Sequence, residues 1–332
     1  MTHRDVSLPV AAQPSLDGLV SLAARAEGLG YDRAWLPETW GRDAVTTLAL
    51  AAERTDTIGL GTSIVNAYSR SPALLGQTAA TLQEASDGRF RLGLGPSGPA
   101  VIENWHGVEF GNPLKRTRET VEVTKRVLSG EPVSYDGDLF DLDGFRLRQG
   151  APDTPVPVDA AGMGPKAVEL CGRFADGWHA LMLTPDGLRD RLDAFRRGAA
   201  LGDRDADDLR VTVSLTCCAM ADAERARDLA RRHVVFYVAA MGDFYRNALA
   251  AQGHGDVADA VCDRWRDDDR EGAKRALDDD LLDDLAAAGS PERARGTVER
   301  FASVDGVDAV AVSFPRAATD DDIRETMAAV AP

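Results

Sequence analysis

The class of fold is indicated most clearly by residues 58–95, which read IGLGTSIVNAYSRSPALLGQTAATLQEASDGRFRLGLG. Residues 58–65 form a short apolar run of the kind that a buried strand needs. Ser71 and Pro72 follow, and because they are favoured at a helix N-cap and a first helical position, a helix is predicted over 73–85. A second strand-like run occupies 90–94. This order predicts two parallel strands joined by a crossover helix.

The same alternation extends in both directions along the chain. Strand-like runs are expected at 6–10, 33–37, 58–65, 90–94, 156–159, 177–182, 211–219 and 309–313. Helical patterns lie between them, for example at 15–29, 73–85, 117–128, 165–174 and 185–200. Eight strands alternating with helices predict an α/β fold, and eight is the number that closes a (β/α)8 TIM barrel. A doubly wound open sheet is the alternative.

No linker or internal repeat divides the sequence, so we expect a single domain over residues 1–332. Two segments interrupt the alternation. Residues from about 131 to 150 hold two Asp-Gly pairs between alternating apolar and polar residues, which predicts a β-hairpin insertion. Residues from about 221 to 289 are highly charged and helical, which predicts a helical insertion. Its apolar stretch 234–241 fits either an oligomer interface or an internal helix face.

The charge of the chain restricts its partners. It carries 54 acidic and 38 basic residues, for a net charge of −16, and such a surface repels nucleic acid. No apolar run approaches the ~20 residues that span a bilayer, and the N-terminus has no signal-peptide pattern, so we expect a cytoplasmic protein. Many aspartates with only four lysines indicate adaptation to high salt, although a GC-rich genome would give a similar bias.

No metal site is expected. The sequence contains no C-x-x-C, and the adjacent Cys217 and Cys218 should point to opposite faces of a strand. The five histidines lack the spacing of metal ligands, and the Asp runs at 267–269 and 278–280 are interpreted as solvated surface. We therefore expect reduced, structural thiols.

In a barrel, the site lies at the carboxyl ends of the strands. Residues 93–98 match G-x-G-x-x-G, but Pro96 and the lack of a clear helix before about residue 116 argue against a dinucleotide fingerprint. We interpret them as a glycine-lined loop that lets a ring system approach the backbone. Residues 161–166, AGMGPK, precede a helix whose amides could bind a phosphate, or form an ordinary turn. For His179, also near a strand end, a structural role is the simpler interpretation.

Together, these strand-end segments resemble the bacterial-luciferase-like superfamily. Within it they are similar to the F420-dependent oxidoreductases, with the archaeal methylene-tetrahydromethanopterin reductases as the nearest pattern. The resemblance covers nearly the whole chain and depends on the order and spacing of its parts. The matching segments are 26–35, 58–72, 82–89, 93–96, 130–147, 216–218 and 281–292.

This resemblance implies hydride transfer between the deazaflavin coenzyme F420 and a small-molecule pterin, methylene-tetrahydromethanopterin. Tetrahydrofolate is the implied carbon carrier if the high-salt composition reflects a halophilic archaeon. The resemblance also implies a homodimer or homotetramer. The turn of Gly162, Met163 and Gly164 is expected to meet the cofactor phosphate, with Ala161 as a further cofactor contact beside it. The residues expected to pass the ring are Ser63, Ile64, Val65, Asn66, Gly95 and Pro96. A non-proline cis peptide, frequent in the superfamily, would match the Ser63–Ile64 bond.

Two departures from the reductase pattern affect the chemistry. The first-strand glutamate of the reductases is replaced by Pro9, and their Asp-His after the second strand is replaced by Glu38-Thr39. Glu38 is therefore the candidate catalytic acid, because a carboxyl group in an apolar pocket can retain a proton near neutral pH. The alternative role for Glu38 is a hydrogen-bonding partner that fixes the cofactor.

Two other functions compete with an F420-dependent reductase. One is an FMN-dependent luciferase-like monooxygenase, which would use O₂; a deazaflavin has carbon at position 5 and reacts poorly with O₂. The other is a non-catalytic paralogue that binds F420 or a flavin without turning over a pterin.

Overall fold

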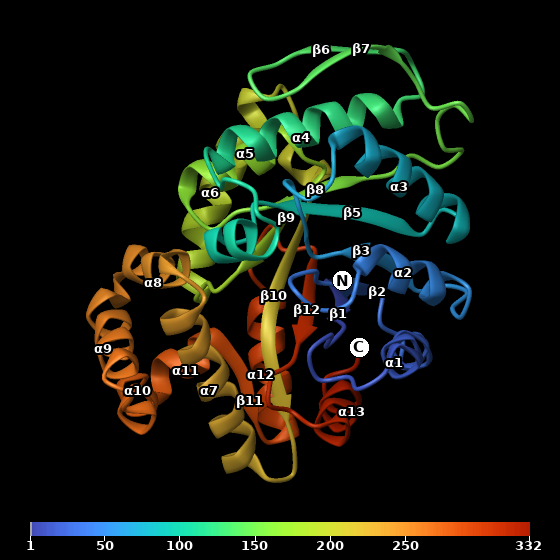
Figure 1. Ribbon diagram of the computed structural model, residues 1–332. Helices are drawn as coiled ribbons and strands as arrows, with labels where there is room; N and C mark the ends of the chain where they lie inside the picture. Colours follow the sequence, from blue (N-terminus) through green and yellow to red (C-terminus); the bar gives the residue numbers. More distant parts are fainter. Residues whose placement is uncertain (1) are drawn as a thin grey trace.

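The computed structural model describes residues 2–332, and within that range eight parallel strands close into a barrel. Strand β12 pairs with β1 and β10 with β9, so the ring has no open edge (Figure 1). The predicted (β/α)8 barrel is confirmed, and an open doubly wound sheet is excluded. In order around the ring the strands are β1 (His3–Ser7), β2 (Arg33–Leu36), β3 (Gly59–Thr62), β5 (Phe90–Gly95), β8 (Val158–Ala161), β9 (Gly177–Leu181), β10 (Arg210–Ala219) and β12 (Ala309–Ser313).

A helix of the outer layer follows each barrel strand along the chain. The side chains of Ser15 and Ser71 cap the first and third of these helices, and Pro72 occupies a first-turn position, as the sequence predicts. Figure 1 shows the outer helices surrounding the strands. They are α1 (Leu16–Gly28), α2 (Ala44–Ala52), α3 (Pro72–Ala85), α4 (Pro113–Leu128), α5 (Pro165–Phe174), α6 (Pro185–Leu201), α12 (Pro291–Ala302) and α13 (Asp320–Ala329).

Several strands differ from their predicted bounds: the fifth lies at Val158–Ala161 rather than 156–159, and the first and third differ most. The first lies at His3–Ser7 rather than 6–10, because the chain turns after Leu8: the Val10 N–H donates to the Leu8 carbonyl. The third, expected over 58–65, divides into β3 and the short β4 (Val65–Asn66), which pairs with β5. The peptide bond between Ser63 and Ile64 is cis, as the resemblance implied.

Strands β6 (Val133–Asp136) and β7 (Asp141–Phe145) form an antiparallel hairpin between α4 and β8, at the top of Figure 1. A segment that leads from a barrel helix to the next strand lies toward the amino ends of the strands. The hairpin is therefore remote from the face on which barrel enzymes build their sites.

The segment between β10 and α12 starts at the carboxyl end of a barrel strand. It contains α7 (Ala223–Ala240), α8 (Asp243–Leu249), α9 (Gly255–Arg266), α10 (Arg270–Ala276) and α11 (Asp279–Leu285). It ends in β11 (Ala286–Gly289), a strand that the sequence analysis missed, which pairs with β10. Val234, Val235 and Val238 are buried within this segment and form an internal helix face, whereas Phe236, Tyr237 and Met241 stay partly exposed.

Strand β10 belongs to two hydrophobic cores. Cys217 packs in the barrel core, whereas Cys218 packs in the core formed by α7, α9 and α11. The expectation that these neighbours point to opposite faces is confirmed, and both thiols are free.

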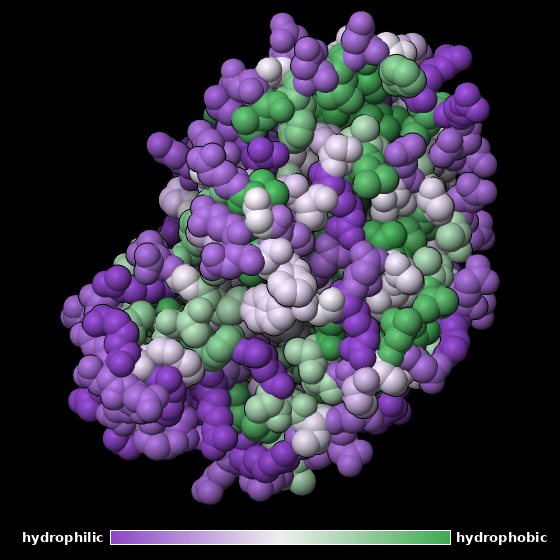
Figure 2. All heavy atoms as spheres, viewed as in Figure 1, coloured by the Kyte–Doolittle hydropathy of each residue, from purple (hydrophilic) through white to green (hydrophobic). Residues whose placement is uncertain are grey.

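On the face shown in Figure 2, hydrophilic residues gather along the rim, whereas apolar and intermediate residues occupy much of the centre. Asp267 and Asp268 are exposed, and residues 2–332 contain no group of three or more His, Cys, Asp or Glu residues arranged to hold a metal ion. No helix in the same range is both long and apolar enough to cross a membrane.

Asp322 of α13 connects the last barrel helix to the start of α7. Its oxygens accept hydrogen bonds from Arg225 at 2.6 and 2.8 Å and from the backbone N–H of Thr319 at 2.8 Å. The Arg225 hydrogen bonds, opposed by burial, lower the pKa of Asp322 to about 2. The carboxylate should therefore stabilise the fold above the usual Asp pKa and lose that effect as the pH falls.

Replacing Asp322 with asparagine is expected to lower the free energy of unfolding at neutral pH by ~1–3 kcal/mol. Folding lowers this pKa, so the wild-type advantage should be complete above about pH 4 and shrink as the pH falls toward 2. Urea denaturation at neutral pH and at about pH 3 measures the difference. Asp305→Asn is the control, since the Asp305 side chain is 98% exposed. If Asp322→Asn loses the same unfolding free energy at both pH values, the stabilisation does not come from the Asp322 carboxylate.

Candidate active site at the barrel mouth

Residues from four different strand ends meet at the carboxyl end of the barrel. A Cβ atom placed on Gly95 would lie 3.0 Å from Ile64 Cγ1 and 3.3 Å from the Cβ of Ala161. The backbone N–H of Glu38 donates to the Ile64 carbonyl at 3.2 Å. Barrel closure therefore brings these four predicted site residues together, with small or apolar groups around Gly95.

A chain of polar side chains leads from the barrel interior to this mouth. Ser63 Oγ lies 3.3 Å from His179 Nδ1, and His179 Nε2 lies 3.5 Å from Asp159 Oδ2. Arg91 donates to both oxygens of Asp159, at 2.9 and 2.6 Å. Burial alone would raise the pKa of Asp159, but Arg91 and His179 hold it well below its usual range. The buried His179 thus lies between a fixed carboxylate and the Ser63 hydroxyl.

The glycines of β3 and β5 create space for large side chains inside the barrel. A Cβ atom on Gly61 would lie 2.3 Å from the Trp35 ring, and one on Gly93 would lie 2.0 Å from the Thr62 carbonyl oxygen and 2.9 Å from His179 Nε2. Gly93 therefore serves packing within the barrel, whereas Gly95 faces the residues of the mouth. This corrects the interpretation of the whole glycine run as a loop for ring approach.

The chain beyond β5 does not enter a long helix directly. It forms one wide helical turn at Val101–Trp105, and α4 begins at Pro113. The exclusion of a dinucleotide fingerprint is consistent with this path. The start of α4 lies three residues before the predicted position near 116.

Both carboxylate oxygens of Glu38 are engaged within the protein. Arg70 donates to Oε1 at 2.6 Å and to Oε2 at 3.0 Å, and the Ala44 backbone N–H donates to Oε2 at 2.9 Å. Arg70 also contacts Asp43, at 2.7 Å. Glu38 is thus surrounded by charged and polar groups rather than by the apolar pocket assumed from the sequence. These contacts make Glu38 the partner of Arg70 and of the Ala44 amide.

Two predicted cofactor contacts, Val65 and Asn66, are each 1% exposed. The Asn66 side-chain oxygen accepts from the backbone N–H groups of Tyr68 and Ser69, at 3.0 and 2.7 Å. These side chains therefore shape the wall of the mouth from within. Pro96 is partly exposed directly after β5.

The N-terminus of α5 lies directly after β8. Gly164 precedes the helix, and no side chain caps its first turn. A Cβ atom on Gly162 would lie 2.7 Å from the Cβ of Ala167, so the loop packs closely on the helix. The Gly162 carbonyl accepts from Trp178 Nε1 at 2.9 Å, and the Met163 carbonyl accepts from Arg191 Nε at 3.0 Å. A fixed loop and an uncapped helix N-terminus form a suitable anion site.

Exposed aromatic side chains occur on the same face of the barrel. Trp40 follows β2, Trp105 follows β5, and Phe244 is the second residue of α8; they are 49%, 65% and 40% exposed. Their faces could cover a flat ligand that lies across the strand ends. Trp105 and Phe244 lie on segments whose positions depend on the fold, so the sequence alone does not indicate them.

Comparison with known proteins agrees with this architecture. Residues 1–308 match the model of the luciferase-like monooxygenase family. The chain belongs to this family. The family-level resemblance seen in the sequence is thereby confirmed.

Similar proteins of this luciferase-like family include F420-dependent enzymes. The chain is 30% identical to a proposed coenzyme F420-dependent oxidoreductase of Mycobacterium tuberculosis, over 82% of this chain and 84% of the relative. It is 28% identical to 5,10-methylenetetrahydromethanopterin reductase of Methanolobus tindarius, over 88% and 89%. The solved F420-dependent tetrahydromethanopterin reductase of Methanopyrus kandleri matches with a TM-score of 0.85, at 22% identity over 99% and 98% of the two chains. This last likeness shows the shared fold.

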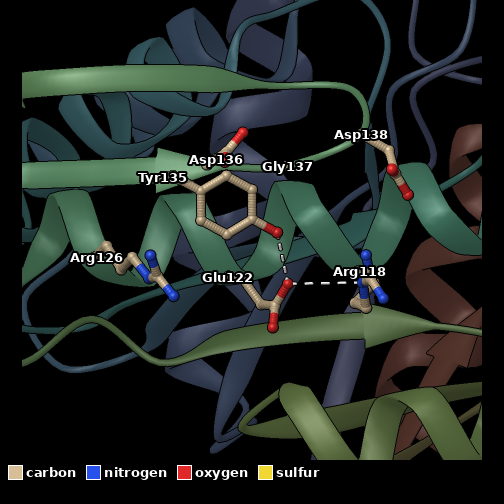
Figure 3. A pocket seen from close by; sticks show the side chains of 7 residues that line it. All are labelled: Arg118, Glu122, Arg126, Tyr135, Asp136, Gly137 and Asp138. Atoms are coloured by element: carbon tan, nitrogen blue, oxygen red, sulfur yellow. Dashed lines mark hydrogen bonds and ion pairs between the residues drawn. The ribbon is translucent and has the colours of Figure 1, made fainter.

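A hollow of about 540 Å³ lies elsewhere on this luciferase-like barrel, between α4 and the β6–β7 hairpin (Figure 3). The Tyr135 hydroxyl donates to Glu122 at 2.7 Å, Arg118 lies 3.6 Å from Glu122, and Arg126 stacks 4.7 Å from the centre of the Tyr135 ring. These polar groups pair with one another, and the hairpin is remote from the strand carboxyl ends. We do not assign this hollow to the active site.

Proposed function

We propose that this protein is an F420-dependent oxidoreductase that transfers a hydride between reduced deazaflavin and a methylene-tetrahydropterin, either methylene-tetrahydrofolate or methylene-tetrahydromethanopterin. The observation that carries the proposal is the convergence of Ile64, Gly95 and Ala161 beside the uncapped N-terminus of α5. This arrangement suits a flat ring joined to a phosphate. The F420-dependent relatives support the choice of deazaflavin over FMN.

The residues of the mouth fit such a cofactor in distinct ways. The first turn of α5 and the Gly162–Gly164 loop would hold the phosphate, because amides at a helix N-terminus bind anions. Ile64, Gly95 and Ala161 would contact the ring, and the cofactor would supply the carbon that donates or accepts the hydride. His179 orients the Ser63 hydroxyl, so Ser63 can donate or accept one hydrogen bond at the edge of the ring.

We assign Glu38 as a positioning residue that holds Arg70 and the β2 loop. Glu38→Gln is expected to lower kcat by less than about tenfold while weakening cofactor binding, because it loses one charged contact with Arg70. Loss of a general acid would instead lower kcat by roughly 10²–10⁴-fold with cofactor affinity unchanged. Steady-state kinetics together with fluorescence titration of F420 separate the two roles. Arg70→Met, which breaks the same pair from the other side, should match the positioning result.

The proposed activity is tested by mixing the purified protein anaerobically with reduced F420 and then adding methylene-tetrahydrofolate or methylene-tetrahydromethanopterin. Return of the oxidised F420 absorbance band only in the presence of a pterin is the expected result. F420 binding without turnover on either pterin would favour the non-catalytic alternative. Binding of FMN but not F420, with O₂ consumption, would favour the monooxygenase and overturn the proposal.

A further inference from the structure

A second hollow, of about 550 Å³, opens on the same side of the barrel as the mouth. One wall comes from Ala11 and Arg316, in the loops that follow β1 and β12, and the other comes from α7, α9 and α10. We call this hollow the insertion groove. Because loops after barrel strands build barrel active sites, a molecule that reaches the mouth can extend into the insertion groove.

The insertion groove is basic although the chain is strongly acidic. Its lining includes Arg232, Arg270, Lys274 and Arg316 but only one acidic residue, Glu271, in a chain with a net charge of −16. A concentration of positive charge in a concave site attracts anions and raises their local concentration.

Internal ion pairs engage three of the four basic side chains. Asp228 is shared by Arg232, at 2.6 Å, and by Lys274, at 2.8 Å, and Lys274 also pairs with Glu271 at 2.9 Å. Arg270 pairs with Asp268 at 3.0 Å. Among residues 2–332, no carboxylate lies within ion-pairing distance of the Arg316 guanidinium.

Arg316 is held in a defined orientation. Its guanidinium carbon lies 4.0 Å from the centre of the Phe236 ring, and its backbone N–H donates to His233 Nδ1 at 3.1 Å. Burial, and then the charge of Arg316, lower the pKa of His233 to about 4, so the ring stays neutral and its Nδ1 remains an acceptor at neutral pH. Stacking occupies the face of the guanidinium, whereas its N–H edge remains available for a carboxylate in two-point contact.

The stacking is repeated once across the insertion groove, although the N–H groups of Arg270 are engaged by Asp268 and by the Trp265 carbonyl. The Arg270 guanidinium carbon lies 3.8 Å from the centre of the Trp265 ring. Two aromatic rings therefore support two guanidinium groups in a single concave site. This geometry suits planar carboxylates better than a single flexible lysine would.

We propose that the insertion groove binds the carboxylates of the substrate, with Arg316 as the main contact, and that the substrate therefore carries an anionic tail beyond its reacting ring. The inference rests on the proposed function, because it assigns the substrate of that site to the carboxylate-bearing pterins. It also gives the insertion a direct part in substrate selection.

The test compares methylene-tetrahydrofolate carrying three glutamates with methylene-tetrahydropteroate, which has no glutamate. Arg316→Met is expected to raise the KM for the triglutamate form roughly ten- to a hundredfold, because a hydrogen-bonded charge pair is lost, while kcat stays within about twofold. The KM for the tail-less form should not change. Arg316→Lys should recover part of the affinity, since it keeps the charge but not the two-point geometry.

Arg126→Met is the matched control. Arg126 also stacks on an aromatic ring, that of Tyr135, but lies in the hairpin hollow of Figure 3. It should leave both KM values unchanged. If Arg316→Met and Arg126→Met behave alike, or if Arg316→Met weakens deazaflavin binding without changing the KM of the triglutamate form, the proposal is overturned.

A binding measurement separates this inference from the proposed function. Quenching of tryptophan fluorescence by pteroyltriglutamate reports its binding at the mouth and the groove without any turnover. Saturable quenching in the wild type that Arg316→Met weakens roughly tenfold would support the groove even if no pterin were reduced. If the protein reduces a pterin but Arg316→Met changes neither the KM of the triglutamate form nor the quenching, the proposed function stands and the carboxylate-binding role of the insertion groove is wrong.

Discussion

Replacement of Arg91 by methionine is expected to lower the free energy of unfolding by about 3–5 kcal/mol, because it leaves the buried Asp159 carboxylate without its charged partner. The Arg91 and Asp159 side chains are 14% and 2% exposed, and the guanidinium contacts both carboxylate oxygens. Only His179 would remain as a contact at 3.5 Å. Chemical denaturation at neutral pH measures the loss.

Two variants serve as comparisons for this prediction. One breaks an exposed ion pair, and the other removes both charges of the Arg91–Asp159 pair. Arg189→Met breaks a pair whose side chains are 57% and 93% exposed, and it should cost less than about 1 kcal/mol. The double variant Arg91→Met/Asp159→Leu should recover part of the loss, since no charge is left buried alone. Equal losses for Arg91→Met and Arg189→Met would show that the interior pair has no special role.

Substitution of Gly162 by valine is expected to weaken binding of F420 by roughly a hundredfold, through displacement of the α5 N-terminus from the phosphate position. The new Cβ would lie 2.7 Å from the Cβ of Ala167 and 2.9 Å from its carbonyl carbon, so the loop and the helix must separate. Fluorescence titration of F420 measures the affinity.

Gly28→Ala is the control for this second prediction, because no atom lies within 4 Å of a Cβ at that position and Gly28 is in the exposed last turn of α1. It should bind F420 like the wild type and be as stable or slightly more stable. Unchanged F420 affinity in a folded Gly162→Val protein would place the cofactor phosphate elsewhere.

The sequence predicts the fold well because each barrel unit carries its own local signals. Ser71 and Pro72 mark a helix start, and the apolar runs around them mark strands that are short enough to be buried on both sides. Strand β11 was missed because its sequence, Ala-Ala-Ala-Gly, has no β-branched or aromatic residue. It becomes a strand because β10 extends beyond the barrel and offers it a free edge.

The candidate site could be predicted only in outline. Strand ends are recognisable in the sequence, so Ile64, Gly95 and Ala161 could be named. The chain of Ser63, His179 and Asp159 could not, because its members come from three segments that meet only after the barrel closes. The environment of Glu38 was misjudged for the same reason: Arg70, its partner, lies 32 positions away along the chain.

The two-sided role of β10 constrains how this protein can diversify. Cys217 and Cys218 anchor the same strand in two cores, and β11 continues the sheet from the barrel into the insertion. An exchange of the entire segment between relatives would remove part of the barrel wall's support. An exchange of residues 243–276 alone would keep α7 and β11 in place while replacing α8, α9 and α10. Replacing residues 243–276 with the matching segment of a relative is therefore the exchange best suited to altering which molecules the barrel accepts.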